Sequence, residues 1–91
     1  MANAASVEKD LGRAVAHAPS GHWEVGSEID RVTLAFDDRH RRRIRLDTDG
    51  GATLLLDLPR AVALSDGDGL SLEGGGWIRV VAAPEAVMEV R

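Results

Sequence analysis

The residues best suited to bind a charged partner form a basic run from Arg39 to Arg45, which reads Arg-His-Arg-Arg-Arg-Ile-Arg. A guanidinium group can donate two parallel hydrogen bonds to a carboxylate or a phosphate, so a row of them suits an acidic protein or a nucleic acid. Successive side chains of a β-strand point to opposite faces, so a strand through this run would place alternate arginines on one face. The predicted partner-binding residues are therefore Arg39, Arg41, Arg43 and Arg45.

Acidic neighbours leave two other interpretations of the basic run open. Five arginines stand against four aspartates over residues 37–49, which leaves a local net charge of only +1. The plainest interpretation is a solvated strand face whose arginines pair with carboxylates such as Asp37, Asp47 or Asp57 and discourage edge-to-edge aggregation. Nucleic-acid binding is less favoured than either alternative, because a nucleic-acid footprint is normally broader and uncompensated.

Histidine is the second residue type that could do chemistry here. Neutral imidazole is a good ligand for nickel and other transition metals, and the chain has His17, His22 and His40. Pro19 and Gly21 separate the first two, so neither a helical turn nor one strand face brings them together. We therefore predict no metal-ligand set in this chain and expect each histidine at the surface or at a strand end.

The sequence does not match the known motifs of catalytic sites or calcium loops. The stretch beginning at Asp47 departs from a calcium loop at Gly51 and Leu58, where that loop requires acidic or amide ligands. The sequence Asp66-Gly67-Asp68-Gly69 is too short for such a loop and is expected to be a solvated turn. No serine lies in a strand–turn–helix nucleophile elbow, and the glycines at 74–76 lack the lysine and helix of a phosphate loop. The chain is predicted to be no enzyme and to hold no cofactor.

Composition bounds the class of protein. A chain of 91 residues forms one small domain with a thin core, and its three aromatic residues are Trp23, Phe36 and Trp77. Phe36 has the parity of a core residue, so few rings are left as stacking platforms for nucleic-acid bases. The absence of cysteine excludes disulfides and thiolate metal sites and allows a reducing compartment. No stretch is apolar enough for a signal or a membrane helix, so we expect a cytoplasmic protein without membrane contact.

Short extended segments separated by turn residues indicate an all-β fold of the barrel or sandwich kind. Residues 1–12 are small and polar and are predicted to be a flexible lead. Asp49-Gly50-Gly51 should reverse the chain into a β-hairpin, and glycine-containing turns are expected at 65–69 and 74–76. The predicted strands are 13–18, 32–36, 43–46, 53–58, 70–72 and 77–83, and 86–90 is either one more strand or the start of a further domain.

An ordered set of motifs resembles the first domain of the UreE family, the nickel metallochaperones of urease assembly. The motifs are Arg31-Val32-Thr33-Leu34, the run Asp38 to Leu46, Leu58-Pro59-Arg60, Leu64-Ser65-Asp66-Gly67-Asp68, and Val80-Val81-Ala82-Ala83-Pro84-Glu85, with Gly21-His22-Trp23 before them. Ala61 stands where the family usually places glycine.

The resemblance implies a small six-stranded, barrel-like, split-hairpin domain over residues 13–91 that docks proteins and performs no chemistry. Its implied partners are the urease apoprotein and other urease accessory proteins. The family's metal-binding and dimerising domain would follow Arg91, so nickel is implied for the full-length member and no nickel ligand is carried over to this chain. A monomer is expected for this chain and a dimer for the full-length member. The competing interpretation is a small β-barrel that binds nucleic acid.

Overall fold

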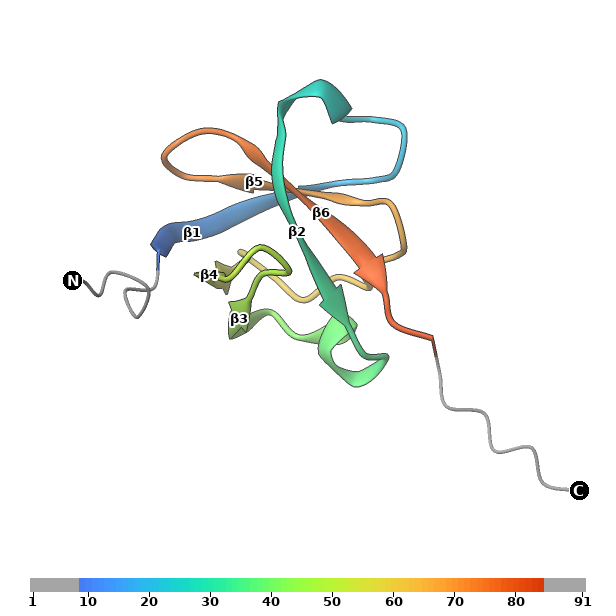
Figure 1. The fold of residues 1–91 in the computed structure, drawn as a ribbon. Coiled ribbons are helices and arrows are strands. Elements are labelled where there is room, and N and C mark those ends of the chain that lie inside the picture. The colour runs from blue at the N-terminus through green and yellow to red at the C-terminus, as the bar shows by residue number, and fades with distance from the viewer. Residues whose placement is uncertain (1–8, 85–91) are drawn as a thin grey trace, which may run out of the picture.

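The computed structural model describes residues 9–84, which form six strands and two short 3-10 helices (Figure 1). Over these residues no helix is both long enough and apolar enough to cross a membrane. The predicted all-β, six-stranded, barrel-like class is confirmed. In chain order the elements are β1 Lys9–Ala18, η2 Val25–Ser27, β2 Glu28–Leu34, η3 Asp37–His40, β3 Arg43–Asp47, β4 Ala52–Asp57, β5 Gly69–Leu72 and β6 Trp77–Ala82.

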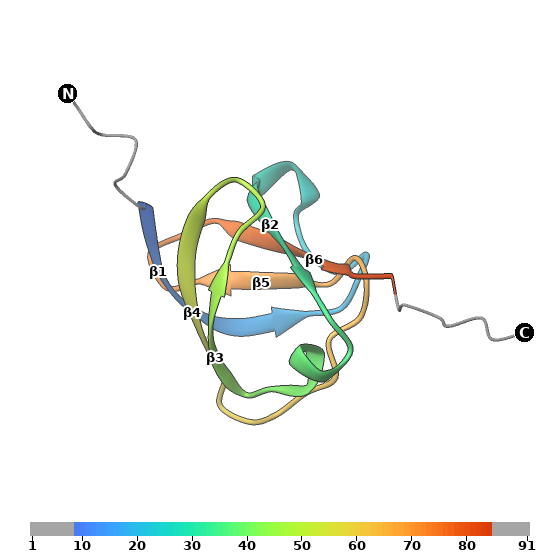
Figure 2. The same ribbon diagram turned by 60° about the horizontal axis from the view of Figure 1, so that its bottom comes forward.

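The six strands form one mixed sheet in the order β2-β6-β5-β1-β4-β3. The pairs β1/β4 and β2/β6 are parallel, and the other neighbouring pairs are antiparallel. The sheet curls into a half-barrel, seen from two directions in Figures 1 and 2. Its two edges approach each other where the backbone N–H of Asp49, just after β3, donates to the carbonyl oxygen of Arg31 in β2 at 2.8 Å.

The core lies inside this curl and follows the predicted alternation of strand residues. Val32, Leu54 and Ile78 come from three different strands, and each is fully shielded from solvent. The buried apolar cluster is Ala14, Val32, Leu34, Leu46, Leu54, Leu56, Leu58, Leu64, Leu70, Leu72, Ile78 and Val80.

Phe36 is not part of this core, and its predicted core position is wrong. The residue is 55% exposed. The alternation of β2 stops at Leu34, and Phe36 has helical dihedrals (φ −53°, ψ −46°) at the start of η3. A period of two holds only while the backbone stays extended, so Phe36 no longer follows Val32 and Leu34 into the interior.

The first strand begins at Lys9 rather than at Arg13, so residues 9–12 of the predicted flexible lead belong to the sheet. Lys9 pairs with Ala52, and the register with β4 shifts between Asp10 and Arg13. Gly12 lies in this bulge with φ +86°, a conformation that glycine adopts without steric cost. The extra residue interrupts the apolar alternation of β1, so a search for strict alternation does not find the start of this strand. Residues 1–8 and the predicted segment 86–90 lie outside the described residues.

The predicted turns are present at the expected positions. The β3–β4 hairpin turns at Gly50 and Gly51, and Gly51 has φ +93° and donates its N–H to the carbonyl oxygen of Thr48 at 3.1 Å. This conformation strains residues with a Cβ atom, so glycine at 51 sets where β3 ends and β4 begins. The turn thereby fixes the register that exposes alternate residues of β3.

Candidate docking surface

The predicted row of four arginines is divided among a 3-10 helix, the connector after it and a strand. Arg39 lies in η3, Arg41 follows that helix, and only Arg43 and Arg45 lie in β3. A strand covering all four residues is therefore wrong. The physical cause is local, because the amides of Asp38 and Arg39 donate back to the carbonyl oxygen of Ala35 at 3.0 and 3.2 Å and form a tight turn in place of an extended chain.

Within β3 the predicted alternation holds. Arg43 and Arg45 are exposed, Ile44 is half-buried, and Leu46 is buried in the core. Both arginines therefore project from the outer face of an edge strand.

Two sets of arginines differ in their ionic contacts. Arg13, Arg31 and Arg79 form ion pairs of 2.7 to 2.9 Å with carboxylates. Across residues 9–84, by contrast, Arg41, Arg43 and Arg45 make no side-chain hydrogen bond or ion pair.

Pairing of Arg43 and Arg45 with neighbouring carboxylates, the plainest interpretation of the sequence, is therefore not what the structure contains. The carboxylate of Asp57 instead accepts from Nη1 of Arg13 at 2.7 Å, and the rest of the Arg13 guanidinium binds Glu73. Asp57 lies opposite Arg43 in the β3/β4 register, so it was the neighbour best placed to neutralise that residue. Its engagement with Arg13 leaves Arg43 available to other groups.

The connector from η3 into β3 is fixed to the loop that follows β4. The carbonyl oxygen of Arg39 accepts from the backbone N–H of Leu64 at 2.8 Å, and that of Arg42 accepts from Leu58 N–H at 3.0 Å. The Arg42 side chain returns a hydrogen bond to the Leu58 carbonyl oxygen at 3.2 Å. Anchoring at both ends means that the exposed side chains stand on a backbone with little freedom to move.

The exposed aromatic ring of Phe36 contacts the first two residues of the basic run, Arg39 and His40. The centroids of the Phe36 and His40 rings are 4.7 Å apart, and the guanidinium carbon of Arg39 lies 5.5 Å from the Phe36 centroid. His40 Nδ1–H donates to the Phe36 carbonyl oxygen at 3.0 Å. We call the region formed by Phe36, Arg39, His40, Arg41, Arg43 and Arg45 the η3–β3 surface.

Phe36 is the residue of this surface that sequence reasoning missed. The signal that could have found it is the polar sequence that starts at Asp37, directly after Phe36, and breaks the alternation. The exposed fraction of Phe36 makes this surface mixed in character, with an apolar group next to cations.

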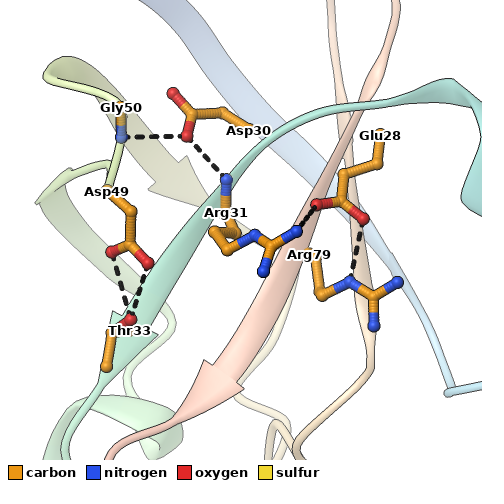
Figure 3. A network of polar contacts seen from close by, with 7 residues as sticks. All are labelled: Glu28, Asp30, Arg31, Thr33, Asp49, Gly50 and Arg79. Carbon is orange, nitrogen blue, oxygen red and sulfur yellow. Dashed lines mark hydrogen bonds and ion pairs between the residues drawn. The ribbon is translucent and has the colours of Figure 1, made fainter.

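The carboxylates of Asp30 and Asp49 form hydrogen bonds that connect the two edges of the half-barrel. Figure 3 shows Oδ1 of Asp30 between two backbone amides, those of Arg31 at 2.8 Å and Gly50 at 3.0 Å. The Asp49 carboxylate accepts from the Thr33 hydroxyl at 2.9 Å. Burial opposes ionisation of Asp30, yet hydrogen bonds from Thr48 and from the amides of Arg31 and Gly50 outweigh it and lower the pKa of Asp30.

Glu28 of β2 binds Arg79 of β6 and also Arg31 of its own strand (Figure 3). Its carboxylate accepts from Arg79 Nε and Arg31 Nη2, both at 2.8 Å. The hydrogen bond from Arg79 is the main cause of a lowered pKa for Glu28, and the contact with Arg31 adds to it. The charges of Glu28, Arg31 and Arg79 are thus satisfied within the sheet and are not free for a partner.

Asp68 was expected in a solvated turn, and this expectation is wrong. The residue is only 4% exposed, and its carboxylate accepts from His17 Nε2, Ser20 N–H and Ser65 N–H at 2.8 to 2.9 Å. Three donors satisfy a buried carboxylate and join the end of β1 to the turn before β5. The role of Asp68 is therefore structural.

Two of the three histidines are engaged in different parts of the fold. His17 is bound to Asp68, and His40 lies in the η3–β3 surface. Over residues 9–84 no group of three or more His, Cys, Asp or Glu side chains could hold a metal ion.

Comparison with known proteins shows which family this chain resembles. The family model described as "UreE urease accessory protein, N-terminal domain" matches residues 8–83. Urease accessory protein UreE of Rhodopseudomonas palustris (strain HaA2) is 50% identical over 70 residues, which cover 77% of this chain and 32% of that protein. The proteins of the same name from Sinorhizobium fredii (strain NBRC 101917 / NGR234) and Mesorhizobium japonicum (strain LMG 29417 / CECT 9101 / MAFF 303099) are 52% and 40% identical over 63 and 79 residues.

These two matches cover 69% and 87% of this chain and 40% of each relative. The chain therefore spans between about a third and two fifths of the length of the three relatives.

Proposed function

Because this chain belongs to the UreE urease accessory protein family, and matches its N-terminal domain, we propose that it serves urease maturation by docking other proteins and catalyses no reaction. Its partners in this proposal are the urease apoprotein and the other urease accessory proteins, and the process that the docking assists is nickel delivery in the cytoplasm. The docking site is the η3–β3 surface. The observation that carries the proposal is the presence there of three arginines without an ionic partner in residues 9–84.

Unpaired arginines on a fixed backbone are well suited to bind carboxylates of a second protein. An arginine already in an ion pair must break that contact before it binds a partner, whereas Arg43 and Arg45 need only lose water. The planar guanidinium group then contacts a carboxylate through two hydrogen bonds, which gives direction as well as attraction. Exposed cations also increase the rate at which an acidic partner is captured, and salt weakens that effect.

The test replaces Arg41, Arg43 and Arg45 together with serine and measures binding to the urease apoprotein and to each accessory protein by calorimetry. The fold should persist, because exposed side chains without contacts usually contribute within about 0.5 kcal/mol each. We expect affinity to fall about tenfold or more, which corresponds to about 1.4 kcal/mol.

A matched control compares single substitutions of the same kind. Arg60 is exposed but lies outside the η3–β3 surface, so Arg60→Ser removes the same charge from another place. Arg43→Ser should weaken binding and Arg60→Ser should not. Unchanged affinity of the triple variant, or equal losses for the two single variants, would overturn the proposed site.

The nucleic-acid alternative is tested in the same preparation. Trp23 and Trp77 are half-buried and stack on each other with centroids 5.5 Å apart, so they are poorly placed to stack on bases. A filter-binding titration with a single-stranded oligonucleotide should show no salt-sensitive affinity near the micromolar range. Such an affinity would indicate that the arginines bind nucleic acid rather than a protein.

A further inference from the structure

We propose that Phe36 is the apolar anchor of the η3–β3 surface, and that the surface fits a folded protein with an apolar pocket bordered by carboxylates. The inference rests on the proposed function and specifies the partner chemistry of the same site.

The Phe36 ring is exposed to solvent. Phe36 is 55% exposed, although a phenylalanine side chain has much apolar area to bury. The other large exposed apolar residues among those described are Val25 and Ile29, which lie before β2 and near its start. Phe36 follows the far end of β2, contacts Arg39 and His40, and is the one aromatic member of this group. Interfaces concentrate their affinity in a few such side chains surrounded by polar contacts.

The Phe36 ring is already held in place by its neighbours. The tilted ring of His40 packs against it at an interplanar angle of 57°, and the Arg39 guanidinium lies over it. His40 also donates to the Phe36 carbonyl oxygen, and the end of η3 is tied to Leu64. A side chain fixed before binding loses little conformational entropy when a partner covers it, so more of the buried area appears as affinity.

The local charge identifies the chemistry that would border the pocket. Residues 36–46 contain five arginines and two aspartates, a net charge of +3 in a chain whose total is −4. Arg41 follows His40 directly, so unpaired cations begin one residue from a side chain that touches the anchor. A complementary surface therefore places carboxylates around the pocket that receives the ring.

The ring also favours a pocket over a stack of bases. Arg39 lies over the ring and the His40 ring packs against it, so the chain's own side chains already occupy positions that a base would need. Insertion of the exposed part of the ring into a pocket is compatible with both neighbours. Oligonucleotide binding that depends on Phe36 is accordingly an outcome that would overturn the inference.

The anchor and the arginines should affect different rate constants. The contacts of a buried apolar ring form late in association and hold the complex together. Removal of the ring therefore acts mainly on the dissociation rate constant, and the effect depends little on salt. Exposed cations steer the encounter, so their loss acts on association and the effect shrinks as salt rises. This difference separates the anchor from the charge in a single kinetic experiment.

The experiment measures binding of the chain to immobilised urease apoprotein and to each urease accessory protein by surface plasmon resonance at two salt concentrations. Phe36→Ser should dissociate about ten times faster at both, as burial of roughly half a phenylalanine side chain predicts. Phe36→Leu should fall between Phe36→Ser and the parent chain. The matched control is Val25→Ser, which removes an apolar side chain of similar exposure, 50%, from η2 and should leave the rate unchanged.

The outcomes distinguish this inference from the function on which it rests. If the parent chain binds none of these proteins, the proposed function fails, and the anchor with it. If the parent binds and Arg43→Ser weakens binding while Phe36→Ser does not, the docking function stands and the anchor is overturned. Equal acceleration by Phe36→Ser and Val25→Ser also overturns it, because general surface hydrophobicity would then explain the effect. Circular dichroism of each variant confirms that the fold is retained.

Discussion

The indole ring of Trp23 lies against the backbone of Gly69, so closely that a Cβ atom at residue 69 would be 2.5 Å from Cδ2 of the ring. The same indole donates its Nε1–H to the carbonyl oxygen of Gly67 at 3.0 Å and stacks on Trp77. The guanidinium carbon of Arg79 lies 5.8 Å from the ring. These contacts fix the segment after β1 on β5 and β6, and they require the residue under the ring to have no side chain.

Gly69→Ala should therefore destabilise the domain. The indole would have to move away from β5, and overpacking of this kind costs about 1–3 kcal/mol. Urea unfolding followed by tryptophan fluorescence measures the change directly. Gly74→Ala is the matched control, because a Cβ atom there would meet nothing within 4 Å and the residue does not have a positive φ. Similar unfolding midpoints for the two variants would contradict the packing argument.

Stability should fall in acid through two carboxylates of β2, Glu28, which binds Arg79 of β6, and Asp30, which bridges to Gly50. The pKa values of Glu28 and Asp30 are lower in the folded protein than their ordinary values of 4.5 and 3.8. The unfolded chain therefore takes up protons first as pH falls, so the stability contributed by these groups is present above their ordinary pKa values and is lost below them.

Thermal unfolding between pH 7 and pH 2 tests this directly. The midpoint should be nearly constant down to about pH 5 and then decline, because proton uptake by the unfolded state starts near the ordinary pKa of glutamate. Glu28→Gln should have a lower midpoint at pH 7 and a shallower decline in acid. A decline as steep as that of the parent chain would remove Glu28 from the explanation.

This chain is not expected to bind nickel tightly by itself. Nickel needs several donors in a fixed arrangement, and residues 9–84 bring no three suitable side chains together. His17 is bound to Asp68, and His40 donates to a backbone carbonyl. Calorimetric titration of the tag-free protein should show no site tighter than about 10 μM, because ligand number and geometry set the affinity. A stoichiometric submicromolar site abolished by His22→Ala or His40→Ala would contradict this.

The chain should be monomeric at moderate concentration. The edge strand β3 carries exposed Arg43 and Arg45, and like charges brought together across a two-fold axis oppose pairing of this edge with a second copy. Light scattering at about 10 μM measures the mass, because association depends on protomer concentration. A stable dimer would contradict the prediction, and a dimer lost on Phe36→Ser would place the contact at the η3–β3 surface.

Features that depend on a few consecutive residues could be predicted from the sequence. The alternation of Val32 with Leu34 and of Ile44 with Leu46 places these side chains on one face whatever the strand pairs with. Gly51 adopts a conformation that glycine favours, which locates the hairpin. The ordered motifs around Leu58-Pro59-Arg60 indicated the family that the comparisons then showed.

Features that depend on distant residues were decided only by the tertiary structure. Whether Arg43 is paired depends on Asp57, which is taken by Arg13, 44 positions away along the chain. Asp68 is buried because His17 and Ser20 reach it from the end of β1, 51 and 48 positions away. Phe36 is exposed because the chain leaves the sheet after Leu34 to form η3. The order of the strands determines which side chains meet, and an alternating pattern contains no information about that order, because each strand can satisfy its own period next to any neighbour.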